Sequence, residues 1–587
     1  MTPWAPPLRD TLFVLDDLLG IPARDDLPQY AVLDRETIEA VVGELGRFCA
    51  DVLAPLDQVA DREGCTRQSD GSVTTPAGFR EAYARLVEAG WTTLAQPPEF
   101  GGQGMPHVML AVIDEYMNSA CAGFTMYPGI LPGAVSTVME TASDHLKETY
   151  VPKMVSGEWL ATMALTEAHC GTDLGLMRTR AVPRGNGTHA LTGQKIFISG
   201  GEHDLTDNIV HLVLARLPDA PEGSRGISLF LVPKVLPGGE RNTVTCGSIE
   251  HKMGLNGSAT CVLDFDEATG WLLGEEHMGL AGMFVMMNAA RLAVGTQGLA
   301  HAENAYQKAV AYALDRRQGR APGERADPAA AADPLIVHPD VRRMLMDARA
   351  FAEGFRALVA WTAMQLDLSH GLDDMVDRKA ADALVSFLTP VLKAFGTDRG
   401  FETAVAMQQV FGGHGYVKEW GMEQIVRDAR IGMIYEGANG VQALDLAGRK
   451  LAKDGGETCE RLLGLVEGAC EDADPELRWI SGPLREAVHE ARDAARWLLS
   501  ESANDANVLG AGSYPFMQLI GTVAMGWMWL RMARIALGRD DAFHAAKLAT
   551  ARYYAEHGLT ACGALRRNIE AGADAMMALE PEQFARA

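Results

Sequence analysis

Apolar residues recur at helical spacing over most of the first 155 residues and predict an all-helical region there. Between 34 and 52 they follow one another at intervals of three and four, as one buried helix face requires. The same spacing returns over 79–89, 108–119 and 146–154. The polar stretch 53–76 predicts a loop, and residues 1–33 predict an N-terminal extension with one short helix near 12–19.

The period changes to two after Trp159, where apolar and polar residues begin to alternate. The clearest strand, 190–199, follows a Gly-Asn-Gly turn. Further short runs rich in strand-forming residues lie at 209–215, 227–232 and 259–265. Turn residues separate these runs, so we predict a small antiparallel β domain over 159–278.

Helical spacing returns after Gly279 and continues to the end of the chain. Its first part predicts four long helices, at 279–317, 338–370, 376–411 and 421–451. Four long helices in succession are typical of an up-and-down bundle, which we place at 279–452. Four more helical stretches, at 458–470, 484–503, 515–537 and 541–578, predict an additional C-terminal helical domain over 453–587. The predicted fold class is mainly α, with an N-terminal helical domain over 34–158 and the small β domain before the bundle.

Composition narrows the possible partners. A chain of 587 residues is too long for one core, and its formal net charge of −25 argues against nucleic acid and anionic membranes as main partners. The most apolar segment, 516–530, is shorter than a membrane span and contains Gly521 and Gly526. We interpret it as a buried core helix and expect no integral membrane insertion; a membrane-associated segment is the alternative.

Cysteine usage and the N-terminus point to one compartment. The nine cysteines are scattered singly, without a CxxC pair, which argues against a zinc site and against a disulfide framework. The first residues lack a basic region followed by an apolar core, so we expect no secretory signal. We therefore predict a cytoplasmic protein with reduced thiols and no metal.

Glu436 is the most suggestive single residue. It stands between Tyr435 and Gly437, and a desolvated carboxylate in such a place has a raised pKa and is a better base. The simpler interpretation is a helix end with a solvated carboxylate. The Gly-Gly-His-Gly string at 412–415 would let the backbone approach a pyrophosphate, although most such strings are turns.

Four segments in this order resemble the signatures of the acyl-CoA dehydrogenases, flavoproteins that desaturate acyl-CoA thioesters. They are 164–173, 195–200, 409–416 and 435–440. The resemblance covers residues 34–450, and that family has a helical domain, a β domain and a four-helix bundle. Four residues depart from the family pattern: Cys170, Leu176, His414 and Gln424.

The resemblance implies FAD as cofactor and Glu436 as the catalytic base. The implied cofactor-binding residues are Leu165, Thr166, Gly171, Thr172, Phe197, Ser199, Arg316, Gln318, Gln409, Gly412 and Gly413. Arg291 and Gly437 are the implied substrate-binding residues. In the family, the positions of Gln409, Gly412 and Gly413 hold the FAD of a neighbouring subunit, which implies a homodimer. For the arginines, a basic helix end or a surface ion pair is the alternative.

The implied reaction is α,β-dehydrogenation of an acyl-CoA to a trans-2-enoyl-CoA, with electron-transferring flavoprotein as acceptor. The added C-terminal domain and the wording of the motifs look like the 3-methylmercaptopropionyl-CoA dehydrogenase branch, which implies a short or medium acyl-CoA. Long-chain fatty acyl-CoA dehydrogenation in β-oxidation and acyl-CoA oxidation stay open. Some relatives bind DNA through an added domain, but residues 451–587 hold 14 basic and 20 acidic side chains, which disfavours that alternative.

Overall fold

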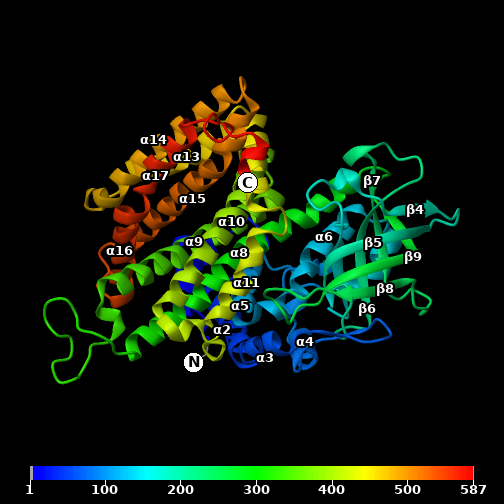
Figure 1. Cartoon of the computed structure of the whole chain (residues 1–587), viewed down its shortest axis with the longest axis horizontal. Helices are drawn as coiled ribbons and strands as arrows, with labels where there is room; N and C mark the ends of the chain where they lie inside the picture. Colours follow the sequence, from blue (N-terminus) through cyan, green and yellow to red (C-terminus); the bar gives the residue numbers. More distant parts are fainter. Residues whose placement is uncertain (1–3, 586–587) are drawn as a thin grey trace. The chain divides into compact units, whose positions relative to one another are not determined.

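Helices form both ends of the chain and a sheet lies between them in the sequence, in the computed structural model that describes residues 4–585 (Figure 1). The described residues divide into two compact units. We call residues 4–6 and 43–293 the sheet unit, and residues 7–42 and 294–585 the bundle unit. The predicted order of helical, β and helical regions is confirmed.

Five helices precede the sheet in the sheet unit. They are α3 (Asp57–Glu63), α4 (Phe79–Glu88), α5 (His107–Thr125), α6 (Leu131–Thr141) and α7 (Asp144–Val155). The loop prediction for 53–76 is wrong for α3, because that helix buries only Ala60 and so has no apolar stripe to recognise. The rest of that stretch holds a short hairpin of β1 (Thr66–Arg67) and β2 (Val73–Thr74).

The main sheet has seven strands. They are β3 (Trp159–Ala164), β4 (Arg180–Pro183), β5 (His189–Ser199), β6 (Asn208–Arg216), β7 (Ile227–Pro233), β8 (Val244–Ile249) and β9 (Thr260–Leu273). The strands pair in the order β3-β6-β4-β5-β9-β7. Because β7 also pairs with β6, this path of pairings closes into a ring, and β8 pairs with β9 beside it. The purely antiparallel prediction needs correction, since β3 runs parallel to β6 along its whole length. Alternation shows which residues face the core but not the direction of the neighbouring strand.

Tyr127 joins the N-terminal helices to this sheet. Its hydroxyl accepts a hydrogen bond from the Ala259 N–H at 2.8 Å and donates to the Gly257 carbonyl at 3.2 Å. The ring also contacts the buried imidazole of His203, edge to face, with centroids 5.4 Å apart. The helices and the sheet of this unit therefore share one packed interior.

Three long helices and two short ones build the bundle. They are α8 (Gly279–Asp315, of which 294–315 belong to the bundle unit), α9 (Pro339–Gly371), α10 (Met375–Val410), α11 (Met422–Arg430) and α12 (Asn439–Leu444). The single helix predicted over 421–451 is wrong, because the chain leaves helical geometry between α11 and α12. Glu436 and Gly437 there have φ of 54° and 86°, which no right-handed helix can include.

Helices α8 and α10 cross at backbone contact distance. A Cβ placed on Gly298 would lie 2.3 Å from the Gly396 carbonyl oxygen, and one on Gly400 would lie 2.3 Å from that of Gly298. Only glycine allows such an approach. The core of the bundle beside this crossing is apolar and draws on α8, α9, α10 and α11, with Ala305, Ala309, Met344, Leu345, Met407, Phe411, Met422 and Ile425 among its members.

The added C-terminal region is helical, as predicted. It holds α13 (Glu457–Glu471), α14 (Arg478–Glu501), α15 (Ala506–Ala536), α16 (Ala542–Tyr553) and α17 (Ala561–Glu570), and α13, α14, α15 and α17 lie side by side (Figure 1). The last predicted helix, 541–578, is divided in two by the π-helical turn Tyr554–Gly558. Helices α8 and α15 are long and apolar enough to cross a membrane by composition. Of the relevant windows, 72% is buried inside the protein in α15 and 33% in α8.

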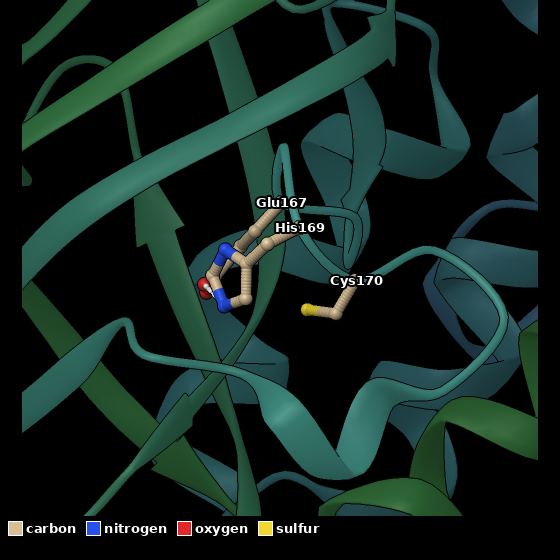
Figure 2. A group of neighbouring side chains, drawn as sticks. All are labelled: Glu167, His169 and Cys170. Atoms are coloured by element: carbon tan, nitrogen blue, oxygen red, sulfur yellow. Dashed lines mark ion pairs between the residues drawn. The ribbon is translucent and has the colours of Figure 1, made fainter.

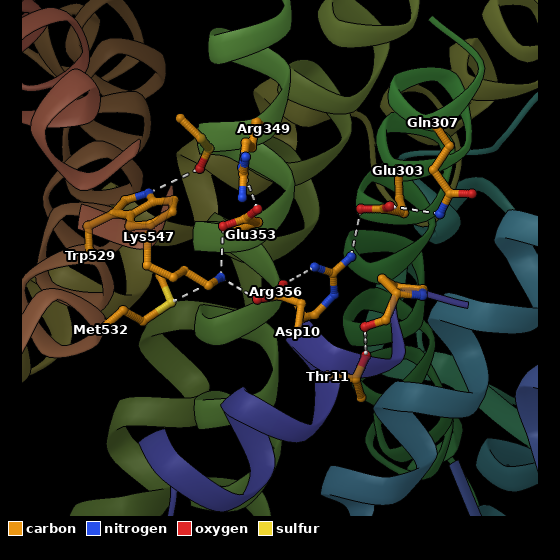
Figure 3. A network of polar contacts seen from close by, with 12 residues as sticks. Asp10, Thr11, Glu303, Gln307, Arg349, Glu353, Arg356, Trp529, Met532 and Lys547 are labelled. Atoms are coloured by element: carbon orange, nitrogen blue, oxygen red, sulfur yellow. Dashed lines mark hydrogen bonds and ion pairs between the residues drawn. The ribbon is translucent and has the colours of Figure 1, made fainter. Parts of the chain in front are cut away.

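The N-terminal segment is built into the bundle unit through a buried ionic network (Figure 3). Asp10, in the short helix α1 (Leu8–Leu12), accepts hydrogen bonds from Arg356 of α9 and Lys547 of α16. Lys547 also donates to Glu353 at 2.7 Å, and Arg356 to Glu303 at 2.8 Å. Burial alone would raise the pKa of Asp10, but the two cations hold it below its usual range. The start of the bundle unit is therefore tied to three other helices.

Candidate functional site

The predicted cofactor residues of the sheet unit gather where β3 ends and β5 bulges. Just after β3, the Leu165 carbonyl accepts a hydrogen bond from the Lys195 ammonium at 2.9 Å. The Thr166 carbonyl accepts one from the Ile196 N–H, also at 2.9 Å. The start of the 165–179 loop therefore lies against the part of β5 that leads to Phe197.

Phe197 is presented to the surface by a bulge in β5. The pairing of β5 with β9 shifts register between Lys195 and Ile198, directly after the Ile196 N–H that bonds the Thr166 carbonyl. Phe197 takes φ of 61° and is 59% exposed. A phenylalanine in the left-handed region costs free energy, and bulges often aim a side chain at a functional site. An exposed, fixed aromatic face is suited to a flat ring system, with Ser199 half-buried two residues further on.

Glu167 lies on the loop after β3 (Figure 2), and its hydrogen bonds hold that loop in place. Its carboxylate accepts hydrogen bonds from the Arg178 N–H at 2.8 Å, the Thr179 N–H at 2.9 Å and the Thr179 hydroxyl at 2.6 Å. The buried Lys195 ammonium adds an ion pair at 2.9 Å. Burial raises the pKa of Glu167, but Lys195 and the three other donors outweigh it and lower the pKa to about 2.

Glu167, His169 and Cys170 offer three potential metal-ligand atoms within 4.8 Å of one another (Figure 2). However, the Glu167 carboxylate already has four donors, and a cation there would compete with Lys195. We therefore interpret the group as one that stabilises the loop, and the absence of a metal stays a prediction. Gly171 and Thr172, which follow directly, are exposed on the same loop.

The predicted cofactor residues of the bundle unit lie at the ends of two helices that meet. Tyr312, one turn before the end of α8, stacks on Phe411 with ring centroids 4.1 Å apart. The Tyr312 hydroxyl lies 2.9 Å from Nδ1 of His414 in the glycine-rich string. The segment that carries Arg316 and Gln318 therefore starts beside the segment that carries the glycines.

Exposure and backbone geometry at these helix ends fit phosphate binding. All five predicted residues are exposed: Arg316, Gln318, Gln409, Gly412 and Gly413. Gly412 has φ of 57°, and a Cβ on either Gly412 or Gly413 would meet nothing within 4 Å. Exposed glycine main chain and an exposed guanidinium are both groups that can bind a diphosphate.

Glu436 lies on the loop that separates α11 from α12 in the bundle unit. The Glu436 carbonyl accepts a hydrogen bond from the Gln442 amide at 3.2 Å, and the next carbonyl, that of Gly437, accepts one from the Lys393 ammonium at 2.7 Å. Burial, together with the Glu436 charge, raises the pKa of the neighbouring Tyr435, whose hydroxyl donates to Gln297. The main chain of the predicted base is thus held at two successive carbonyls.

The sequence did not predict the contacts that Lys393 and Tyr312 make in this region. A lone lysine in the apolar run of α10, between Leu392 and Ala394, was the available signal for Lys393, because a buried lysine needs partners. Nothing in the sequence around Tyr312 indicated that its ring stacks on Phe411.

Two further features of the sheet unit are the predicted substrate residue Arg291 and an apolar pocket. The Arg291 guanidinium lies 5.9 Å from the centroid of the Phe284 ring on the same helix, and Arg291 is half-buried. The pocket lies among the N-terminal helices and is lined by residues that include Trp91, Met117, Leu131 and Asp114. Burial raises the pKa of Asp114 to about 7.

Comparison with protein families gives four matches that follow one another along the chain. The acyl-CoA dehydrogenase N-terminal, middle and C-terminal domains match residues 35–158, 162–268 and 277–451. A further model, described as acetyl-CoA dehydrogenase C-terminal like, matches residues 462–580. The added helical region therefore has counterparts in other proteins.

Two curated relatives match nearly the whole chain. A 3-methylmercaptopropionyl-CoA dehydrogenase of Ruegeria pomeroyi is 43% identical over 97% of this chain and 98% of its own length. A broad-specificity linear acyl-CoA dehydrogenase, FadE5, of Mycobacterium tuberculosis is 32% identical over 98% of this chain and 99% of its own. Both are similar across the added C-terminal region as well as the rest of the chain.

Solved structures support the fold. ACDH-11 of Caenorhabditis elegans, in complex with C11-CoA, matches with a TM-score of 0.77 at 20% identity, covering 95% of this chain and 93% of its own. An acyl-CoA dehydrogenase of Bacillus anthracis complexed with FAD matches with a TM-score of 0.74 at 20% identity, covering 93% and 90%. From the family models and the close relatives, we conclude that this chain belongs to the acyl-CoA dehydrogenase family and is an FAD-dependent oxidoreductase.

Proposed function

We propose that Glu436 is the base of this acyl-CoA dehydrogenase and that its preferred substrate is a short thioester of the 3-methylmercaptopropionyl type. The observation that carries the first part is the backbone at Glu436. A non-glycine residue with φ of 54° is strained, and here the strain lies where the bundle helix is interrupted. Gln442 and Lys393 hold the carbonyls of Glu436 and Gly437, so the surrounding structure fixes this geometry.

The chemistry that we assign to the chain is removal of a weakly acidic proton. The Glu436 carboxylate takes the α-proton of the acyl group, and the Glu436 N–H donates to the thioester oxygen while negative charge develops there. When bound, FAD supplies the two-electron oxidation that makes the product a trans-2-enoyl-CoA. We also assign Gly437 and Arg291 to the acyl-CoA; the missing side chain of Gly437 lets the Gln442 amide lie against the loop, since a Cβ there would be 2.4 Å from its nitrogen.

The residues present fit the FAD that the family uses. We assign Leu165, Thr166, Gly171, Thr172, Phe197 and Ser199 of the sheet unit, and Arg316, Gln318, Gln409, Gly412 and Gly413 of the bundle unit, to holding it. The exposed Phe197, fixed at φ of 61°, supports this assignment for the ring system. The exposed Arg316 supports it for the diphosphate.

Arg316→Ala should lower the FAD content of the purified protein, measured by its absorbance ratio, and unchanged content would contradict the assignment.

The preference for a short thioether substrate rests on the Ruegeria pomeroyi relative, which is 43% identical along almost the entire chain. The test is anaerobic titration with methylmercaptopropionyl-, butyryl-, octanoyl- and palmitoyl-CoA while flavin absorbance is followed. We expect methylmercaptopropionyl-CoA to bleach the flavin at the lowest concentration. Preference for palmitoyl-CoA would replace our assignment with the long-chain alternative.

We further propose a cytoplasmic homodimer that passes electrons to electron-transferring flavoprotein. The nine free cysteines support the reducing compartment. Turnover that needs electron-transferring flavoprotein and consumes little oxygen is expected, whereas stoichiometric oxygen consumption would identify an oxidase. Light scattering of the holoenzyme tests the dimer.

A further inference from the structure

A chain of polar groups connects the Glu436 loop to the added C-terminal region, entirely within the bundle unit. Its members Lys393, Asn439, Asp398 and Gln518 are buried, whereas Tyr514 at its end is 41% exposed. It begins at Lys393 of α10, which is fully buried. The Lys393 ammonium donates to the Gly437 carbonyl at 2.7 Å and to the Asn439 side-chain oxygen at 2.8 Å. One cation therefore holds both the main chain after the base and the first residue of α12.

Asn439 passes the connection on to Asp398. Its amide nitrogen donates to Asp398 at 2.7 Å, to the Thr397 hydroxyl at 3.0 Å and to the Ala394 carbonyl at 3.1 Å. The amide oxygen thus faces the lysine and the amide nitrogen faces the carboxylate. A dipole oriented between opposite charges is stabilised by both of them in a low-dielectric interior.

The second oxygen of Asp398 is held by the added region. Helix α15 supplies the Tyr514 hydroxyl at 2.5 Å and the Gln518 amide at 2.8 Å, one turn apart on the same helix face. Asp398 is 2% exposed, so these two donors provide contacts that water would otherwise make. The appended helices thereby complete the polar shell of a residue in the bundle.

We propose that Asp398, held by Tyr514 and Gln518, is a positioning residue for Glu436, acting through Asn439 and Lys393 on the main chain at Gly437. This proposal rests on the proposed function of Glu436. It gives the added C-terminal region a role in the reaction: that region fixes the orientation of the loop that carries the base.

The arrangement favours positioning over simple packing. Well-packed apolar side chains stabilise a fold at least as well as buried charges do, because buried charges lose their hydration. Here Lys393 and Asp398 are both buried, and the groups between them belong to the one loop whose geometry the reaction needs. Hydrogen bonds are directional, so this chain sets the orientation of the groups that it joins.

The test uses the full-length holoenzyme with three variants: Tyr514→Phe, Gln518→Leu and Asp398→Asn. The rate of flavin bleaching in an anaerobic single turnover with methylmercaptopropionyl-CoA reports proton removal, while KM, FAD content and Tm report binding and folding. Because a misplaced base can lower a rate by up to about 100-fold, we expect that drop for Asp398→Asn and about tenfold for Tyr514→Phe and for Gln518→Leu, with FAD content and KM nearly unchanged.

Tyr553→Phe is the matched control. The Tyr553 hydroxyl of α16 also donates to a carboxylate of the bundle, that of Asp347 on α9, at 2.8 Å. This variant removes the same group from the same added region without touching the Glu436 loop. We expect its bleaching rate to equal that of the unmodified enzyme.

The outcomes separate this inference from the proposed function. Bleaching by Tyr514→Phe and Asp398→Asn at the unmodified rate, while Glu436→Gln is inactive, would overturn the positioning role alone. Equal slowing by Tyr514→Phe and Tyr553→Phe would also overturn it, because the effect would then be general. If Glu436→Gln bleaches normally, the proposed function itself fails.

Discussion

Two loops of this protein, one in each unit, are held by the same device and serve different purposes. In the sheet unit, buried Lys195 donates to the Leu165 carbonyl and to Glu167. In the bundle unit, buried Lys393 donates to the Gly437 carbonyl and to Asn439. Each lysine thus fixes one main-chain carbonyl and one side chain of its loop.

The loops differ in the origin of the negative charge that balances the lysine. In the first loop, that charge comes from Glu167 itself, whose low pKa and four donors leave it committed to structure. In the second, neutral Asn439 accepts a hydrogen bond from the lysine and donates one to Asp398. The negative charge therefore comes from Asp398, which belongs to α10. Because another element supplies the structural charge, the second loop can keep a glutamate for chemistry.

Replacing Lys195 should have the largest effect on stability. Lys195→Met leaves the 5% exposed Glu167 without its cation, and removing one partner of a buried ion pair typically costs about 3–5 kcal/mol. Urea unfolding measures the change in the free energy of unfolding. Adding Glu167→Met should recover part of it, and a loss below about 1 kcal/mol for Lys195→Met alone would show that the pair is not structural.

Asp114 extends the comparison to a carboxyl that has no cation partner among the described residues. Burial raises its pKa from 3.8 to about 7. Between pH 4 and 7 the folded state then binds more protons than the unfolded state, so this group lowers stability as pH rises through that window. Asp114→Asn should be nearly equal in stability to the unmodified protein near pH 4 and about 4 kcal/mol more stable at pH 8. Urea unfolding at both pH values measures this, and an equal difference at both would contradict it.

Replacing Lys393 should cost less stability but more activity. Lys393→Met leaves the Gly437 and Asn439 oxygens without this donor, which should lower the free energy of unfolding by about 2 kcal/mol. It also removes a contact that holds the loop of Glu436, so proton removal should become slower. Urea unfolding and single-turnover bleaching measure the two effects. If Lys393→Met bleaches the flavin as fast as the unmodified enzyme does, the role of Lys393 in holding the loop of the base is contradicted.

The smallest effect is expected at Phe197, which shares its left-handed backbone with Glu436 (φ of 61° and 54°). Phe197→Gly relieves the strain and loses little burial, so the apoprotein should gain about 1 kcal/mol in thermal unfolding. The same change should weaken FAD binding, measured by equilibrium dialysis. A less stable apoprotein with unchanged FAD affinity would show that Phe197 is a packing residue.

Sequence patterns predicted the order and type of most elements because long apolar periods report buried faces directly. They failed where the period carries no information. Ile431, Met433 and Ile434 continue a helical spacing through a segment that is not one helix, and only Gly437 hinted at the interruption. The direction of β3 beside β6 depends on a connection of more than forty residues, which alternation does not report.

The candidate site was predictable where a local motif carries it. Glu436 and the glycine-rich string were identified from short segments, and their assigned roles stay predictions. The supporting residues were not, because Lys393, Asp398 and Tyr514 come from distant parts of the sequence and meet only in the folded chain. A lone lysine in an apolar helix indicates that partners exist, but it does not identify them.

The measurement that tests the central claim most directly is the anaerobic single turnover of Glu436→Gln. Glutamine keeps the size of the side chain but cannot accept the proton, so we expect intact FAD content, an unchanged Tm and bleaching slowed by about 100-fold to 10,000-fold with methylmercaptopropionyl-CoA. Bleaching at the unmodified rate would contradict the assignment of the base.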